Sequence, residues 1–145
     1  MNAKQIDVVQ ASFAKVVPIA DIAADLFYAR LFELDPSLRN LFKGDMKRQG
    51  AMLMSMIASA VRGLTDPNAL LPVLTTLGRR HAGYGVMDTH YETVGDALMW
   101  TLAQGLGKDF TPEVRESWAA AYWMMVDTMK AGSRESMRPP VALAA

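Results

Sequence analysis

The sequence predicts an all-α protein, and three observations carry that prediction. Apolar side chains recur at steps of three and four residues through most of the chain, the period of helices with one buried face. At 35–36, 66–67 and 111–112 an aspartate or threonine stands directly before a proline, a pair that caps a helix and begins its first turn. No convincing run of alternating apolar and polar residues indicates a strand.

In the first half, the spacing predicts three helical pieces. The first is a half-buried helix around residues 19–31, whose apolar positions are Ile19, Ile22, Ala23, Leu26 and Leu31. Asp35 then caps a short helical piece from Pro36 to Phe42. Gly44 and Asp45 open a longer helix that carries one face formed by Gln49, Leu53, Ile57, Ala60 and Leu64.

In the second half, the spacing predicts three further helices. One follows Pro67 and carries a stripe of Leu70, Leu74, Leu77 and His81; we expect Pro72 to split it, because proline kinks a helix interior, and Gly83 to end it. Thr89 and Glu92 have the spacing of a capping box, which predicts a helix with Tyr91, Val94, Leu98 and Leu102 inward. The last begins at Thr111-Pro112, with an inner face of Trp118, Ala121, Tyr122, Met125 and Met129, and ends at Arg138-Pro139-Pro140.

Length and composition indicate one domain. The 145 residues, of which 51% are hydrophobic, are enough for a single core, and we expect the domain to cover residues 1–133 with a flexible C-terminal tail over 134–145. Fifteen basic and fifteen acidic residues cancel, which argues against a nucleic-acid partner. No apolar run is long enough for a membrane span and no signal peptide is apparent, so we expect a cytoplasmic protein.

The chemistry available to the chain is narrow. It has no cysteine, so a metal ligand must be a histidine, a carboxylate or, less commonly, a methionine. The sequence contains no HExxH motif, no phosphate-binding glycine loop, no nucleophile elbow and no inward Glu-x-x-His pairs. The sequence therefore offers little support for catalysis by protein side chains alone.

Polar residues occupy positions where the helical period calls for apolar ones. Gln49, His81 and Tyr91 each interrupt an apolar stripe, and Tyr28 stands beside Phe27 and above Leu31. Because a buried polar group costs free energy unless it is paired, each of them needs a neighbour or a ligand. Taken singly, a capped or satisfied residue is the commoner explanation. His90 follows the predicted cap at Thr89 and is interpreted as a first-turn surface residue.

Taken together, four stretches of sequence resemble the globin family, in particular bacterial single-domain haemoglobins and the haem domain of flavohaemoglobins, with some similarity to neuroglobin. They are FYARLFELDPSLRNLF (27–42), LGRRHAGYGV (77–86), HYETVGDAL (90–98) and LGKDFTPEVRESWAAAY (106–122). The resemblance runs from the first helix to about residue 130 and implies a globin fold, a three-over-three helical sandwich enclosing a haem pocket. The implied cofactor is haem b, iron protoporphyrin IX held non-covalently.

The resemblance also assigns roles to individual residues. His81 becomes the iron ligand on the proximal side, and physical chemistry agrees, because a neutral imidazole on an apolar stripe presents one nitrogen to a metal and the other to a backbone carbonyl. On the distal side, Tyr28 and Gln49 become hydrogen-bond donors to bound oxygen. The remaining contacts implied with the haem are Phe42, Leu53, Leu77, Val86 and Tyr91, and for a propionate Arg80 or Arg79, either of which is equally well explained as a solvated helix end.

At one proximal position the chain departs from the family pattern. In flavohaemoglobins the tyrosine matched by Tyr91 orients the histidine together with a glutamate of the last helix; here that position falls on Ser133, and Glu135 lies two residues further. Without the carboxylate the histidine donates less electron density to iron, which disfavours peroxidase chemistry. The distal helix has no histidine, so we expect an open or water-bound sixth position, with Met52 a remote alternative.

Functionally, the resemblance implies reversible binding of O2, CO and NO, as in oxygen transport or nitric oxide detoxification. If the protein is an enzyme, a nitric oxide dioxygenase-like activity that depends on an external reductase is favoured over weak peroxidase activity. The alternative is a globin-fold gas sensor or protein-interaction module. We expect a monomer or a homodimer.

Overall fold

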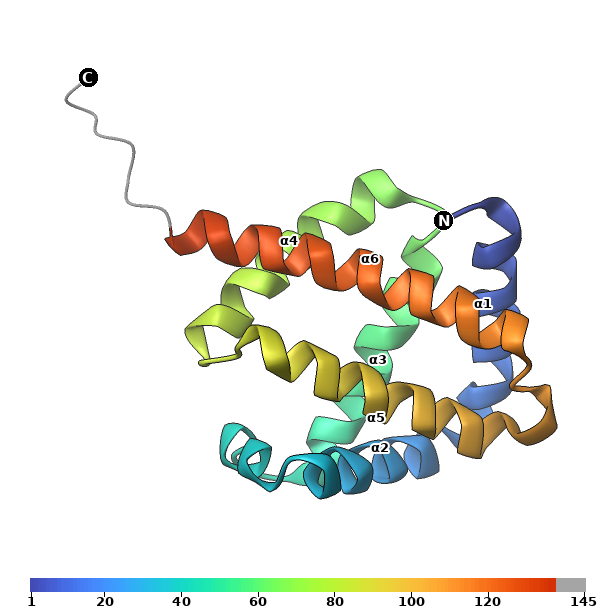
Figure 1. The fold of residues 1–145 in the computed structure, drawn as a ribbon, viewed down its shortest axis with the longest axis horizontal. Coiled ribbons are helices and arrows are strands. Elements are labelled where there is room, and N and C mark those ends of the chain that lie inside the picture. The colour runs from blue at the N-terminus through green and yellow to red at the C-terminus, as the bar shows by residue number, and fades with distance from the viewer. Residues whose placement is uncertain (138–145) are drawn as a thin grey trace.

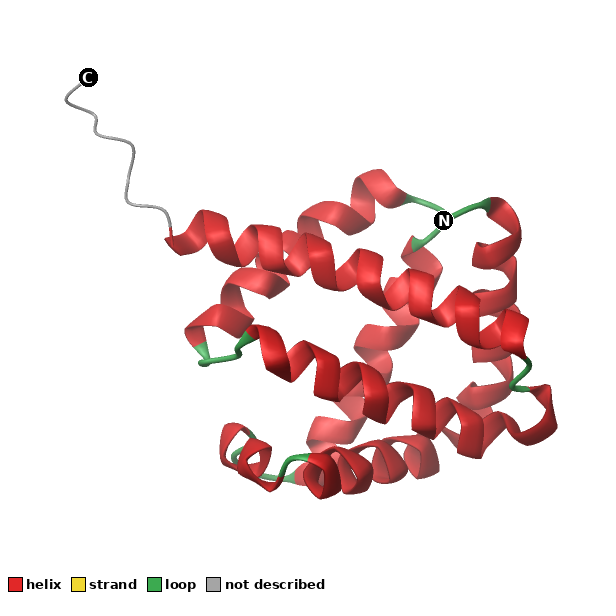
Figure 2. Cartoon of the chain, in the orientation of Figure 1, coloured by secondary structure: helices red, strands yellow, loops and turns green. Residues whose placement is uncertain are grey.

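Helices make up nearly all of the computed structural model, which describes residues 1–137 (Figures 1 and 2). No strand occurs within that range, so the all-α prediction is confirmed. The elements in chain order are α1 (Ala3–Val16), η1 (Val17–Ile19), α2 (Ala20–Leu34), η2 (Pro36–Leu41), α3 (Met46–Gly63), α4 (Pro67–Gly83), α5 (Asp88–Leu106), η3 (Gly107–Asp109) and α6 (Pro112–Met137).

The six α-helices form two layers. In the view of Figure 1, α2, α5 and α6 lie in front of α1, α3 and α4. Helix α6 packs on both α4 and α1, and α2 packs on α5 and α3. This is the three-over-three arrangement that the sequence predicted. Within residues 1–137, none of the helices combines the length and the apolarity needed to cross a bilayer.

The core divides into two clusters. The larger one joins α1, α3, α4, α5 and α6 and contains the indole of Trp118, whose Nε1 donates a hydrogen bond of 2.8 Å to the buried Ser12 hydroxyl. The smaller one lies between α2, η2 and α5 and contains Phe27, Tyr28, Leu31, Leu38 and Ala97. The smaller cluster thus contains Tyr28, one of the two polar residues predicted for the distal side of the haem pocket.

Helices α4 and α6 cross with their backbones in direct contact. A Cβ atom added at Gly78 would overlap the carbonyl oxygen of Met129, and one added at Gly132 would overlap the carbonyl oxygen of Thr75. Each helix therefore contributes one glycine to the crossing, and only a residue without a side chain fits at either position. The crossing fixes α4, the helix that carries His81, against the long last helix.

The predicted aspartate caps form at Asp35 and Asp45, whereas Asp66 holds the N-cap position of α4 without a side-chain cap hydrogen bond. The Asp35 carboxylate accepts from the backbone N–H of Ser37 at 3.1 Å, and the Asp45 carboxylate accepts from that of Lys47 at 2.9 Å. Helix α5, however, begins at Asp88, before the predicted cap at Thr89. The reason is that His90 supplies the partner: its Nδ1 accepts from the backbone N–H of Met87 at 2.9 Å. His90 thus stabilises a helix start, in agreement with its predicted place in the first turn.

Two other local predictions were wrong. Pro72 does not split its segment, because α4 is continuous with the proline in its second turn. Pro72 and Asn68, whose carbonyl would have accepted its missing N–H, are both exposed, so water can solvate that carbonyl. Ile22 is not part of the inner face of α2, since its side chain is 58% exposed. The buried face consists instead of Ala23, Ala24, Phe27, Tyr28 and Leu31.

At the C-terminal end, α6 continues to Met137, four residues beyond the boundary expected at residue 133. The remainder of the expected tail, including Arg138-Pro139-Pro140 and the final VALAA, lies outside the described residues.

Candidate functional site

The geometry of His81 leaves one ring nitrogen available. The residue lies in the last turn of α4 and is half-buried, and its Nδ1 is 2.8 Å from the carbonyl oxygen of Leu77, one turn earlier. This is the backbone partner expected for a metal-binding imidazole, and with the Nδ1 proton donated there, Nε2 carries the free lone pair. Burial lowers the pKa of His81 below its ordinary value of 6.5, which the Leu77 hydrogen bond partly offsets. The ring is therefore neutral at neutral pH and suited to bind a metal.

Tyr91 packs its ring against that histidine. The two rings are stacked, with centroids 6.4 Å apart and an angle of 21° between their planes. Tyr91 is buried at the start of α5, and burial together with the nearby Asp88 raises its pKa above the ordinary value of 10.0. The histidine is thus held by ring contact with Tyr91 and by its hydrogen bond to Leu77.

Tyr122 connects this wall to α6. Its hydroxyl donates a hydrogen bond of 2.5 Å to the backbone carbonyl of Tyr91, and its ring lies over Gly95, where a Cβ atom would come within 2.8 Å of Cε2. Burial, with the neighbouring Tyr91 and Asp96, raises the pKa of Tyr122, so it stays a donor. Further along α6, Ser133 is half-buried, whereas the side chain of Glu135 lies outside the described part of the helix.

The opposite wall holds the two predicted distal residues. Tyr28 on α2 is buried, and its hydroxyl lies 3.4 Å from the backbone carbonyl of Gln49 on α3, a long distance for an O–H···O bond. Burial raises the pKa of Tyr28, so the hydroxyl keeps its proton. The side chain of Gln49 is half-buried. The structure therefore brings the Tyr28 hydroxyl to the backbone of Gln49 and leaves the tyrosine proton only weakly engaged.

Phe42 closes the corner between η2 and α3. Its ring meets Tyr28 edge-on at 5.3 Å and Phe32 at 5.6 Å between centroids. Leu53, one helical turn after Gln49, packs against the same cluster. Phe42 and Leu53 thus form an apolar border around the distal polar groups.

The other predicted site residues differ in how far they are buried. Leu77 and Val86 are half-buried and pack against the larger core cluster. Arg80 is exposed at the end of α4. Met52 is 53% exposed, so it does not belong to the inner face of α3, and it is removed as a candidate sixth ligand.

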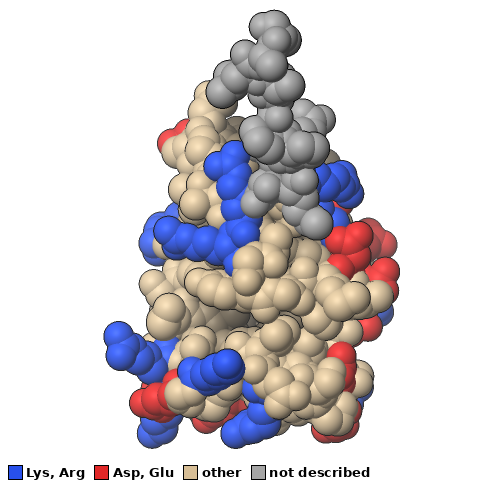
Figure 3. All heavy atoms as spheres, turned by 90° about the vertical axis from the view of Figure 1, so that its left-hand side faces the viewer, with Lys and Arg blue, Asp and Glu red and all other residues tan. Residues whose placement is uncertain are grey.

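One end of the molecule is hollowed. Figure 3 looks at the end of Figure 1 where the α4–α5 turn and η2 lie, and shows a recess there with lysine and arginine side chains above and below it. His81 belongs to the last turn of α4, just before the α4–α5 turn, and Phe42 directly follows η2. The donor set fits a haem: one neutral imidazole with a free nitrogen, apolar side chains on both walls, and cations at the rim for its carboxylates.

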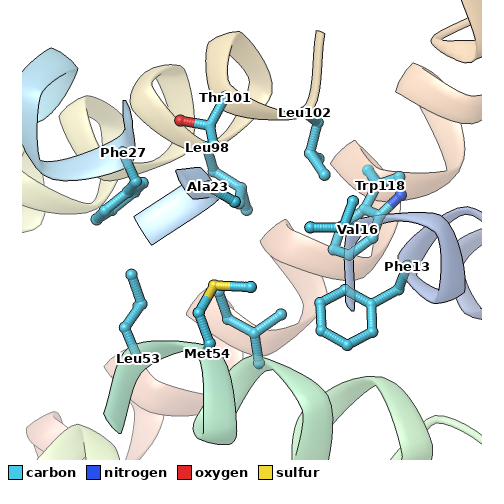
Figure 4. A pocket seen from close by; sticks show the side chains of 11 residues that line it. Phe13, Val16, Ala23, Phe27, Leu53, Met54, Leu98, Thr101, Leu102 and Trp118 are labelled. Atoms are coloured by element: carbon cyan, nitrogen blue, oxygen red, sulfur yellow. The ribbon is translucent and has the colours of Figure 1, made fainter. Parts of the chain in front are cut away.

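Sequence reasoning did not find an apolar cavity that adjoins the distal wall (Figure 4). The volume open to the centre of a water-sized sphere is about 20 Å³, room for one small molecule. Thr101 contributes no free polar group, because its hydroxyl donates to the Ala97 carbonyl at 2.8 Å. The residues that line the cavity include Phe27, Leu53, Met54, Leu98, Thr101 and Trp118. Met54 thus contributes to the cavity from α3.

Comparison with known proteins identifies the family. The globin family profile matches residues 25–129, more than half of the chain. The chain belongs to the globin family. Among curated proteins it is similar to the flavohemoprotein of Chromobacterium violaceum, 36% identical over 107 residues, and to that of Xylella fastidiosa, 31% identical over 109 residues.

These relatives are much longer than this globin. The matched residues cover 71% and 73% of the chain but only 26% and 27% of the two flavohemoproteins. Among solved structures the globin is similar to a hexacoordinated heme protein from an anhydrobiotic tardigrade, with a TM-score of 0.83, 16% identity, and coverage of 92% of this chain and 96% of that one. At that identity the structural likeness supports the globin fold.

Proposed function

We propose that this globin binds haem b through Nε2 of His81 and takes up O2, CO and NO reversibly. The observation that carries the proposal is the neutral, half-buried imidazole whose Nδ1 is engaged by the Leu77 carbonyl, so that Nε2 alone remains for a metal. When bound, haem would supply an iron that can take up a gas molecule. Met52 is exposed and would not compete for that iron.

The residues around the recess have separable roles. Tyr28 donates its weakly engaged proton to the bound gas, and Gln49 is a second donor from α3. Leu53 and Phe42 exclude water from the distal side, and Leu77 and Val86 do so on the side of His81. Arg80 pairs with a haem propionate at the rim. Because burial keeps Tyr28 protonated, it acts as a donor across the physiological pH range.

Oxidation of nitric oxide to nitrate is the enzymatic activity that this site supports best. The reaction joins one NO and one O2 and takes up one electron, which an external reductase must supply. The matched relatives, of which the chain covers about a quarter, are named flavohemoproteins, and a flavin is a cofactor that can pass electrons, which supports a reductase partner. The proposal includes a location in the cytoplasm. Peroxidase activity is less favoured, since Ser133 provides no carboxylate to increase electron donation by His81.

Absorption spectroscopy of the haem-loaded protein tests the proposal. We expect a five-coordinate reduced spectrum that shifts on exposure to O2 and to CO. His81→Ala should lose haem or change its spectrum, and added imidazole should restore the reduced five-coordinate spectrum. His90→Ala is the matched control, since it removes the other histidine from the start of α5, and should bind haem as the wild type does. Haem binding that is indifferent to His81 would favour a sensor or interaction module in place of a haem-ligating globin.

A further inference from the structure

A lysine contacts Tyr91, the tyrosine whose ring stacks on His81. The Nζ atom of Lys130, on α6, is 5.6 Å from the centroid of the Tyr91 ring, within the range of a cation–π contact. Tyr91 in turn stacks on His81. Lys130 is half-buried, as is typical of a lysine whose aliphatic stem packs on apolar surface while its ammonium group stays in contact with water. A positive charge and the candidate iron ligand thus both lie against the same aromatic ring.

We propose that Lys130 is a positioning residue whose charge favours the reduced state of the iron bound through His81. The inference rests on the function proposed above. Ferric haem carries one more positive charge than ferrous haem, so a cation held close to the histidine destabilises the oxidised state more than the reduced one. The contact with Tyr91 keeps this charge next to the ring that stacks on His81.

The charged groups that act on the two tyrosines of this wall, Asp88 and Asp96, are acidic and oppose Lys130. Asp88, in the first turn of α5, is the acidic residue that influences Tyr91, but it is exposed, so its charge is screened by water and salt. Asp96 influences Tyr122, not the histidine pair. Arg79 and Arg80, next to His81 in sequence, have the same sign as Lys130. Ser133, on α6, is neutral.

The reduction potential of the iron matters for a globin that must be reduced again after each turnover. A higher reduction potential makes electron transfer from a donor more favourable and slows spontaneous oxidation of the iron. Lys130 would thus set how readily this chain is kept in the gas-binding state, without touching the gas itself.

Spectroelectrochemical titration of the haem-loaded protein tests this inference. We expect Lys130→Met, which keeps an unbranched stem but loses the charge, to lower the ratio of ferrous to ferric haem at a fixed solution potential by about fivefold. Lys130→Gln should behave in the same way, and Lys130→Arg, which keeps the charge, should stay within about twofold of the wild type. Asp88→Asn should move the ratio in the opposite direction by a smaller factor, and added salt should reduce every difference.

Lys108→Met is the matched control, because Lys108 is exposed in η3 at the far end of α5. Its ratio should equal that of the wild type. If the neutral variants at 130 fold, bind haem through His81 and keep the wild-type ratio, or if Lys130→Arg changes it as much as they do, the inference is wrong and the proposed function stands. A wild type that does not bind haem through His81 would overturn both.

Discussion

The two walls of the proposed haem site differ in how completely their polar groups are paired. On the proximal wall, formed by α4, α5 and α6, Nδ1 of His81 is 2.8 Å from a carbonyl, and Tyr122 donates a bond of 2.5 Å to the backbone of Tyr91. On the distal wall, formed by α2 and α3, the Tyr28 hydroxyl has only a carbonyl at 3.4 Å. The polar groups named on the proximal wall are thus paired within the protein, whereas the Tyr28 hydroxyl on the distal wall is only weakly paired.

The difference matches the roles proposed for the two walls. A metal ligand must be held in one tautomer and one orientation, so its second nitrogen and the ring beside it are engaged by the protein. A group that recognises a gas must instead have a proton to give when the gas arrives, because a fully satisfied donor would first have to break a bond. Backbone contact at the α4–α6 crossing completes the rigid side.

The largest effect is expected from breaking the proximal wall at its crossing. Gly78→Ala places a methyl group on the Met129 carbonyl, which forces α4 and α6 apart, and we expect it to lower the free energy of unfolding by about 3 kcal/mol or more. Urea unfolding of the haem-loaded protein measures this. Gly83→Ala is the control, since nothing lies within 4 Å of its Cβ position and the substitution should be neutral or stabilising by up to about 1 kcal/mol. Equal behaviour of the two variants would contradict the crossing as described.

This crossing also marks the limit of what the sequence predicts about the fold. Helix starts at Pro36, Pro67 and Pro112 follow from signals that lie within a few residues of each other, and the structure has all three. The contact between Gly78 and Met129 joins residues 51 positions apart and leaves no local pattern. Pro72 shows the converse, because a local rule predicted a break where the buried Leu70 and Leu74 on either side keep α4 continuous.

In the site, too, the sequence predicts the local features and not those that arise between helices. The position of His81 on an apolar stripe and its backbone partner could be predicted, because both depend on residues within one helical turn. Three other features could not be predicted, because each arises between helices. They are the weak bond of Tyr28, the contact of Lys130 with Tyr91 and the cavity beside Leu53. Sequence alone thus identifies a candidate ligand and leaves the groups that adjust its chemistry to the tertiary structure.

An effect of intermediate size is expected on the distal wall. Tyr28→Phe removes the weakly paired donor, and we expect O2 to dissociate about tenfold faster, as the loss of one hydrogen bond to a partly charged ligand predicts. The free energy of unfolding should change little, because the bond lost within the protein is a long one. Stopped-flow O2 release measures the rate, with Tyr84→Phe as the control at a tyrosine that is 69% exposed. An unchanged rate, together with faster release in Gln49→Leu, would make Gln49 the donor instead.

The smallest effect is expected from Tyr122→Phe, which sharpens the comparison from the proximal side. The variant keeps the ring over Gly95 and loses only the bond to the Tyr91 carbonyl, so we expect a loss of about 1 kcal/mol in the free energy of unfolding. Because Tyr91 then stacks less firmly on His81, the iron–histidine stretching band in the resonance Raman spectrum should shift or broaden. Tyr28→Phe should leave that band unchanged, since its hydroxyl serves the other wall. Should both variants alter the band equally, the two walls would be mechanically coupled and the division drawn between them would fail.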